Sequence, residues 1–197
     1  MELPLVLAGP ILRRVEPRAV AVWVALSRPA TVSLVLWEGL RKSGTSAVPI
    51  ARSPPLAALR IGERLCIAVA VAERLLPDVP LLPGVNYAYD LVIEQAVDPK
   101  RRTLASEGLL GTFDGVARAP EETWFSEAPL GYTPGFLPSF ALPPAELAQL
   151  RLVYGSCRLL ANMHFDAMPW IDTLIEDAFA GQSRADGATL GTAAAER

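Results

Sequence analysis

The sequence predicts a mainly β protein, in which an N-terminal antiparallel β-sandwich is followed by an incomplete α/β unit of one strand and one helix. Three observations lead to this fold class. Apolar side chains alternate with period two in several segments of residues 1–115. Proline and glycine, with 18 and 14 of the 197 residues, supply turn signals between these segments. After residue 148 the pattern changes to one strand, a tight turn and one amphipathic helix.

Four segments carry the alternation: residues 19–26, 31–37, 65–71 and 85–93. Trp23 is expected on the face of its strand that points away from the apolar row. Trp23, Tyr87 and Tyr89 could line a ligand groove, but a place in the core or in a contact between domains is the favoured interpretation. The side chains expected to face the core are Val20, Val22, Val24, Leu26, Val32, Leu34, Leu36, Tyr87, Tyr89, Leu91 and Ile93.

The segments between the strands are predicted as turns and loops. Residues 41–55 are polar and rich in proline and serine, which predicts a loop. Arg13-Arg14 and Lys100-Arg101-Arg102 are too short to form a nucleic-acid patch, and each is predicted to lie in a turn. Pro83-Gly84 precedes a Tyr-x-Tyr strand, and this combination resembles immunoglobulin/fibronectin-like sandwiches.

Four regions follow from these patterns. Residues 1–115 form the β-sandwich domain, and residues 116–148 form a connector in which prolines alternate with aromatic residues. Residues 149–180 contain the α/β unit, with a strand at 149–154 and a helix that begins near Asp166 and has Pro169 in its first turn. Residues 181–197 are small and polar and are predicted to be a frayed tail. The apolar stripe of the helix consists of Met168, Ile171, Leu174, Ile175, Ala178 and Phe179.

Composition excludes several classes of protein. A hydrophobic content of 51% argues against a wholly disordered chain, and a net charge of −3 argues against a sequence-independent nucleic-acid binder. No signal peptide or membrane-spanning run is recognised, so the expected location is the cytoplasm, with no membrane partner. Cys66 and Cys157 could form at most one disulfide, and in the cytoplasm both thiols are expected to be reduced.

The strongest candidate for chemistry is Gly155-Ser156-Cys157-Arg158, at the end of the predicted strand. Ligands and catalytic groups of α/β enzymes gather at such strand ends. Arg158 could hold a phosphate oxygen or lower the pKa of the thiol of Cys157. The competing interpretation is a small buried cysteine without a chemical role. His164 with Asp166 could bind a metal, although a loop position before the helix is favoured.

Several sequence blocks follow one another in order: residues 8–15, 20–25, 83–89, 142–144, 150–152, 155–158, 166–168 and 172–175. As an ordered set, these blocks resemble the PhoD-like (alkaline phosphatase D type) metallophosphatases. The first blocks resemble the N-terminal sandwich of that family, and the later ones resemble its entry into the phosphatase domain and its first helix. They cover roughly residues 5–177, and their specificity lies in their order.

The resemblance implies hydrolysis of phosphoesters at a cluster of metal ions, with iron and calcium as the cofactors. It places a metal ligand at Cys157 and leaves Arg158 for the substrate phosphate. The family's next motif, a strand that ends in Gly-Asp-x-x-Tyr, is absent, and so are its later Asn and His motifs. Leu159-Leu160-Ala161 also replaces the polar residues that usually follow the Cys-Arg pair. The expectation is therefore an N-terminal fragment, from a truncation, a frameshift or a split gene, that is inactive alone.

Two other interpretations remain open. In the first, the sandwich is a non-catalytic binding or interaction module, and residues 149–180 dock on a protein partner or drive self-association. In the second, the chain is a complete small enzyme that uses Cys157 as a nucleophile. The second is the less favoured, because His164 would have to fold back to act as the base.

Overall fold

The computed structural model describes residues 3–74, 79–111, 129–131 and 133–150. The chain divides into two compact units, Met1–Ala145 and Glu146–Arg197. The first unit holds the whole sheet. In the second, the described residues form one turn of 3-10 helix, η2 (Leu147–Gln149).

The first unit is one antiparallel sheet of ten strands in the described residues. The main path through it runs β1-β2-β7-β4-β3-β8-β10, while β5 pairs with β3, β6 with β7 and β9 with β8. The strands are β1 (Val6–Val15), β2 (Ala19–Leu26), β3 (Thr31–Glu38), β4 (Ala51–Arg52), β5 (Leu56–Ala57), β6 (Leu59–Gly62), β7 (Leu65–Arg74), β8 (Asn86–Gln95), β9 (Asp98–Arg102) and β10 (Ser139–Ala141).

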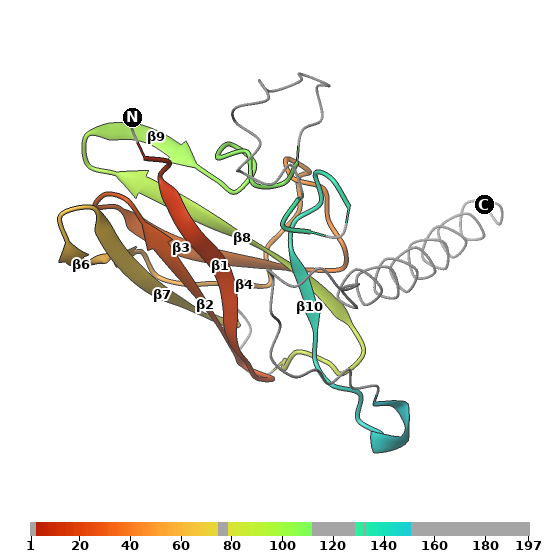
Figure 1. The fold of residues 1–197 in the computed structure, drawn as a ribbon. Helices are drawn as coiled ribbons and strands as arrows, with labels where there is room; N and C mark the ends of the chain where they lie inside the picture. The colour runs from red at the N-terminus through yellow and green to blue at the C-terminus, as the bar shows by residue number, and fades with distance from the viewer. Residues whose placement is uncertain (1–2, 75–78, 112–128, 132, 151–197) are drawn as a thin grey trace, which may run out of the picture. The chain divides into compact units, whose positions relative to one another are not determined.

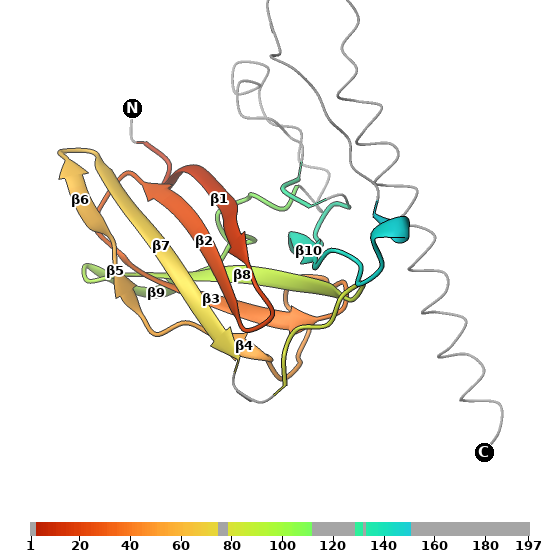
Figure 2. The same ribbon diagram turned by 90° about the horizontal axis from the view of Figure 1, so that it is seen from below.

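The sheet is curled. β1, β2, β6 and β7 run side by side, and β3 and β8 cross behind them (Figure 1). The view from below shows the same two groups of strands crossing each other (Figure 2). β4 joins the groups, because Ala51 and Arg52 pair with β3 on one side and with β7 on the other. A single hydrophobic cluster contains side chains from both groups, so the core lies inside the curl.

The alternation predicted from the sequence is confirmed in the core. The inward rows of β2 and β3 are almost fully buried, and so are Tyr87, Tyr89, Leu91 and Ile93 of β8. Register explains how they meet, since Leu34 lies opposite Leu91 and Leu36 lies opposite Tyr89 across the β3–β8 pair. Burial of these branched and aromatic side chains is the main favourable contribution to the stability of the sheet.

β7 turns its small side chains inward and its large ones outward. Cys66, Ala68, Ala70 and Ala72 are buried, whereas Val69 and Val71 are exposed. Because Val22 of β2 lies beside Ala70, the small residues of β7 share the inward face with the large residues of β2. Period two in a sequence predicts the strand but not which face is buried, and here the larger face points to solvent.

Three predictions about connecting segments are wrong. Arg13-Arg14 belongs to β1, and Lys100-Arg101-Arg102 belongs to β9, so neither lies in a turn. Residues 41–55 are not entirely a loop, because they contain β4. The short strands were missed because they are built from polar or proline-flanked residues, whose pairing comes from neighbours distant in the chain. Both arginines of β1 suit an edge strand, since charged side chains discourage pairing with other molecules.

Gly9 lies in an irregular part of β1 and has a backbone φ of +92°, a conformation that residues other than glycine rarely adopt. A Cβ atom there would lie 2.9 Å from the carbonyl oxygen of Trp23. We expect Gly9→Ala to lower the free energy of unfolding by about 2 kcal/mol. Urea unfolding followed by tryptophan fluorescence measures the change. Gly62→Ala is the control, because its Cβ would meet open space, and an equal loss in both variants would contradict the explanation.

The regions predicted after residue 111 are described only in part. Of the connector 116–148, residues 116–128 and Tyr132 lie outside the described residues, and β10 forms within its last part. The predicted strand 149–154 begins at Gln149, which instead ends η2, because the first turn of this unit closes a 3-10 hydrogen bond between Leu150 and Leu147. The predicted helix near 166–180 and the tail 181–197 lie outside the described residues.

Candidate functional site

The residues that the sequence nominates for chemistry are not part of the described structure. Cys157, Arg158, His164 and Asp166 all lie beyond residue 150. Their roles as metal ligand, phosphate contact and alternative metal ligands therefore stay predictions. The described residues themselves contain no group of three or more His, Cys, Asp or Glu side chains that could hold a metal ion.

Cys66, the other cysteine, has a structural position in β7. Its thiol is free and buried, and it lies opposite Leu26 across the β2–β7 pair. A thiol that faces an apolar core has no access to solvent or to a charged ligand, so it acts as a small hydrophobic side chain.

Asp90, in the middle of β8, is a buried carboxylate with a defined role. Its side chain is only 7% exposed. The backbone N–H groups of Leu91 and Leu104 donate hydrogen bonds to Oδ1 of Asp90, at 2.8 and 3.0 Å. Burial raises the pKa of Asp90 to about 6, and the two backbone hydrogen bonds lower it in part.

Asp90 lies in β8 between the residues that pair with β10 and those that pair with β9. β10 pairs with residues 86–88 of β8, and β9 pairs with Ile93 and Gln95. Between these contacts, the carboxylate accepts the N–H of Leu104 and so attaches the segment after β9 to the strand. Leu104 itself is fully buried. Asp90 is therefore a clasp between the sheet and residues 103–111.

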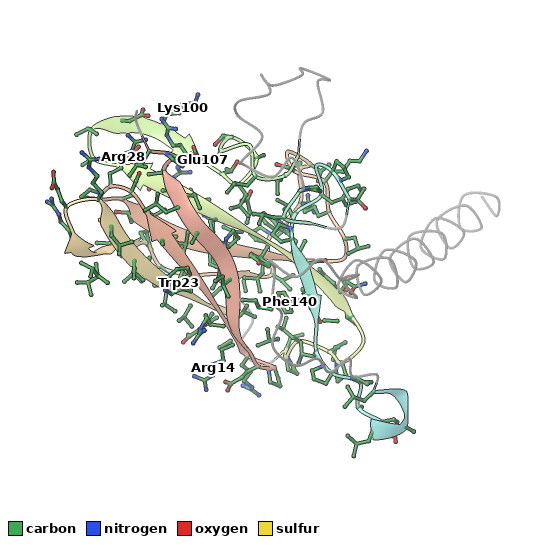
Figure 3. The ribbon with its side chains drawn as sticks, viewed as in Figure 1. Arg14, Trp23, Arg28, Lys100, Glu107 and Phe140 are labelled. Atoms are coloured by element: carbon green, nitrogen blue, oxygen red, sulfur yellow. The ribbon has the colours of Figure 1, made fainter. Side chains whose placement is uncertain are left out.

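An ion-pair network lies beside this clasp, on β9 and the residues that follow it. Arg102 reaches Asp98 and Glu107, each at 3.0 Å, and Arg101 reaches Glu94 at 2.6 Å. The pKa of Asp98 is lowered, first by the N–H of Lys100 and then by Arg102. Arg28, Lys100 and Glu107 gather at the same end of the sheet (Figure 3). Opposite charges nearly balance here, so the cluster ties β9 to its neighbours and offers little attraction for an anion.

A hollow of about 370 Å³ opens between the turn after β3 and the segment 105–111. Its lining is Lys42, Ser43, Gly44, Ala105, Leu110, Gly111 and Gly135. Lys42 is the charged residue of this lining, and its ammonium group lies 5.6 Å from the centre of the Phe136 ring. The ammonium is thus already engaged in a cation–π contact, and one such group does not define a ligand.

The aromatic candidates divide between two places. The core position of Tyr87 and Tyr89 is confirmed, and both rings pack on Phe140 of β10, with centroids 5.7 and 6.3 Å apart. The Tyr87 hydroxyl accepts the N–H of Leu82 at 2.8 Å. Burial raises the pKa of Tyr89 to about 12. Trp23 is half-buried on the opposite face of the sheet, as its position in the alternation predicts, and these three rings do not line one groove.

The face around Trp23 is apolar and open to solvent, and we call it the outer apolar face. One row across the strands consists of Ile11, Trp23 and Val69. The next row includes Ala25, Ile67 and Leu59, and the row on the other side includes Arg14, Ala21 and Val71. Its most exposed large side chains are 42% to 70% accessible: Ile11, Leu59, Val69 and Val71.

Sequence reasoning found neither Asp90 nor the outer apolar face. For Asp90 a signal exists, because a lone carboxylate inside an apolar strand is rarely buried without a hydrogen-bonded partner. For the face, a signal exists in β7, where large residues alternate with alanine. Neither signal identifies the neighbouring residues. Leu104, which donates to Asp90, and Val69, which lies beside Trp23, both come from other segments of the chain.

Comparison with known proteins supplies no further assignment. Among the described residues, no helix has the length and apolar character needed to cross a bilayer. A scan against protein-family models, a search of curated proteins and a search of solved structures found no match to this chain.

Proposed function

We propose that this chain is the N-terminal part of a PhoD-like metal-dependent phosphatase or phosphodiesterase and is inactive on phosphoesters by itself. In this proposal the curled sheet is an immunoglobulin/fibronectin-like sandwich, and residues 149–180 begin the metallophosphatase-like α/β domain. The observation that carries it is the ordered set of sequence blocks that ends in Gly155-Ser156-Cys157-Arg158.

Two features of the β-rich unit support the proposal. The blocks at residues 8–15, 20–25 and 83–89 all fall in or beside strands of one antiparallel sheet, namely β1, β2 and β8. The block at 142–144 follows β10 directly, at the end of the unit Met1–Ala145. A β-rich unit that ends near residue 145 corresponds to the first part of the order that the resemblance implies.

The proposed chemistry assigns two roles beyond residue 150. Cys157 would be a thiolate ligand for the iron at the end of a strand, and Arg158 would contact the phosphate of the substrate. A bound metal cluster makes water nucleophilic and neutralises the phosphoryl oxygens. Because the described residues contain no donor set of their own, the β unit would support this domain and would not hold the metals.

The test compares this chain with a chimera. The chimera continues the chain with the region of a PhoD-like phosphatase that begins at its strand ending in Gly-Asp-x-x-Tyr. We expect the chain alone to hydrolyse no bis-p-nitrophenyl phosphate and to carry no stoichiometric iron or calcium by elemental mass spectrometry. The chimera should gain both properties.

Cys157→Ser in the chimera is the control for the metal site, and it should lower the metal content and the rate together. A folded chimera whose metal content does not depend on Cys157 would reject the family assignment. Stoichiometric metal and turnover by the chain alone would instead show that the site is complete without the missing motifs.

A second candidate function is a non-catalytic β-sandwich binding module. The observation in its favour is the outer apolar face, where the exposed side chains of Ile11 and Val69 flank the half-buried Trp23, because exposed apolar patches often mark interaction sites. This candidate predicts association without metal and without hydrolysis, and it is the one that remains if the chimera experiment fails.

A further inference from the structure

Residues 103–111 follow β9 and lie against β8, and we call them the cap segment. Part of its backbone bonding is internal, since the N–H of Leu109 donates to the carbonyl of Leu104 at 3.0 Å. The side chains of Leu104 and Leu110 are buried. The N–H of Leu104 donates to Oδ1 of Asp90 and so joins the segment to the middle of β8. The polar part of this attachment is thus a carboxyl group, which can gain or lose a proton.

The carboxyl of Asp90 lies in neutral surroundings. It is on the face of β8 opposite to Tyr89 and Leu91, and its neighbour across the β3–β8 pair is Val35, which is 1% exposed. Its hydrogen-bond donors are the backbone N–H groups of Leu91 and Leu104, which carry no net charge. When the carboxyl is ionised, these two donors replace only part of the hydration that burial removes.

The charged side chains on the elements around Asp90 have other partners or face solvent. Arg102 pairs with Asp98 and Glu107, each at 3.0 Å. Arg52 shares the cross-strand row of Val35 and is exposed. The pKa of Asp90 is instead raised by burial and lowered in part by the two N–H groups. The charged residues of these elements and their turns are Arg28, Glu38, Arg41, Lys42, Arg52, Glu94, Asp98, Lys100, Arg101, Arg102 and Glu107.

We propose that the cap segment is a pH-sensitive strap, which is closed while the Asp90 carboxyl is protonated and opens locally in more molecules once that carboxyl is ionised. A protonated carboxyl keeps a carbonyl oxygen that accepts the N–H of Leu104, and it carries no charge for burial to penalise. Local opening returns the ionised group to water and exposes Leu104 and Leu110. It also removes one wall of the hollow described above, because Ala105, Leu110 and Gly111 belong to its lining.

This inference is independent of the proposed function, and it concerns one segment while the sheet stays folded. Hydrogen exchange of the full chain, followed for each amide by NMR, tests it. The exchange rate of an amide divided by its intrinsic rate gives an opening constant. We expect the opening constants of Leu104 and Leu109 to rise about tenfold from pH 5 to pH 7.5, as follows for a carboxyl with a pKa of about 6 when closed and 3.8 when open.

Comparison with β2 separates local opening from unfolding of the whole sheet. At pH 7.5 the opening constants of Leu104 and Leu109 should exceed those of Val22 and Val24 by roughly tenfold or more. Low concentrations of urea should leave the constants of the cap segment unchanged, because a local opening exposes little surface.

Asp90→Asn isolates the carboxyl, because asparagine keeps an oxygen acceptor and does not titrate. Its cap segment should have the same opening constants at both pH values, although all other titrating groups, including His164, are shared with the unmodified chain. Glu107→Gln is the matched control. It removes the carboxyl that pairs with Arg102 within the cap segment, so it should raise the opening constants equally at both pH values and keep the tenfold rise.

A measurement on the unmodified chain does not depend on how the variants fold. The chemical shift of the Asp90 carboxyl carbon should titrate with a midpoint of about 6, and the rise in the opening constants should level off above the same pH. Three results would overturn the proposal: opening constants that do not depend on pH, a rise that persists in Asp90→Asn, or amides of the cap segment that exchange no faster than those of β2.

Discussion

Replacing Leu34 by alanine is expected to lower the free energy of unfolding by about 2–5 kcal/mol. The side chain of Leu34 is fully buried in β3 and lies opposite Leu91, which is also fully buried. The substitution removes three carbons and leaves a cavity that the surrounding strands cannot readily close, because two hydrogen bonds to Ser53 hold the backbone of Leu34 in place. Its N–H donates to the Ser53 hydroxyl at 2.8 Å, and its carbonyl accepts the N–H of Ser53.

The measurement is urea unfolding at neutral pH, with the midpoint and slope compared between variants. Leu56→Ala is the matched control. Leu56 of β5 is 42% exposed, so this variant makes the same chemical change at the surface. We expect the control to lose less than about 1 kcal/mol. Equal losses in the two variants would mean that the interior of the curl is not the core described above.

Replacing Asp90 is expected to change stability differently for two different side chains. Asparagine keeps an oxygen that can accept the N–H groups of Leu91 and Leu104, and it removes the buried charge. Asp90→Asn should therefore raise the free energy of unfolding at pH 7 by about 1–3 kcal/mol. Alanine removes the charge and the acceptor together. Asp90→Ala should be about 2–4 kcal/mol less stable than Asp90→Asn, because two buried N–H groups lose their partner.

The pH dependence of stability follows from the direction of the shift. The pKa of Asp90 is raised by burial from 3.8 in the unfolded chain to about 6 in the folded one. Between these values the folded chain holds a proton that the unfolded chain has released. The contribution of Asp90 to stability therefore falls as the pH rises from about 4 to about 6, and it stays constant above that.

The difference in unfolding free energy between the unmodified chain and Asp90→Asn isolates this contribution, since all other carboxylates are shared. We expect the advantage of the asparagine variant to grow between pH 4 and pH 6 and then to level off. An advantage that does not depend on pH would show that the Asp90 carboxyl has an ordinary pKa and that the clasp is open to water.

The long strands could be predicted because each carries its own pattern. In β3 and β8 the large residues alternate with smaller or polar ones, although both faces are buried in the central part of each strand. β4, β5 and β9 could not be predicted in this way. Ala51 and Arg52 have little preference for a strand, and they become one because β3 and β7 offer hydrogen bonds on both sides.

The candidate functional residues also differ in whether local sequence could identify them. Cys157 and Arg158 could be nominated from local sequence, because a short motif at the end of a predicted strand can be recognised from a few consecutive residues. Asp90 and Trp23 have roles that depend on residues far along the chain, such as Leu104 and Val69. No local pattern in β2 indicates that the exposed side of Trp23 will adjoin an equally apolar row.

The order of strands in the curled sheet has a consequence for how the chain reaches its native state. Leu26 pairs with Cys66 and Thr31 pairs with Glu94, so the central neighbours lie roughly 40–60 positions apart. Such contacts must close long loops before they gain any burial, and proteins dominated by them fold in milliseconds to seconds. During synthesis β3 leaves the ribosome well before β8, and the edge of β3 that pairs with β8 has no partner in that interval. We expect this unpaired strand edge to make the nascent chain prone to aggregation, and the tendency is set by topology more than by the strength of any single contact.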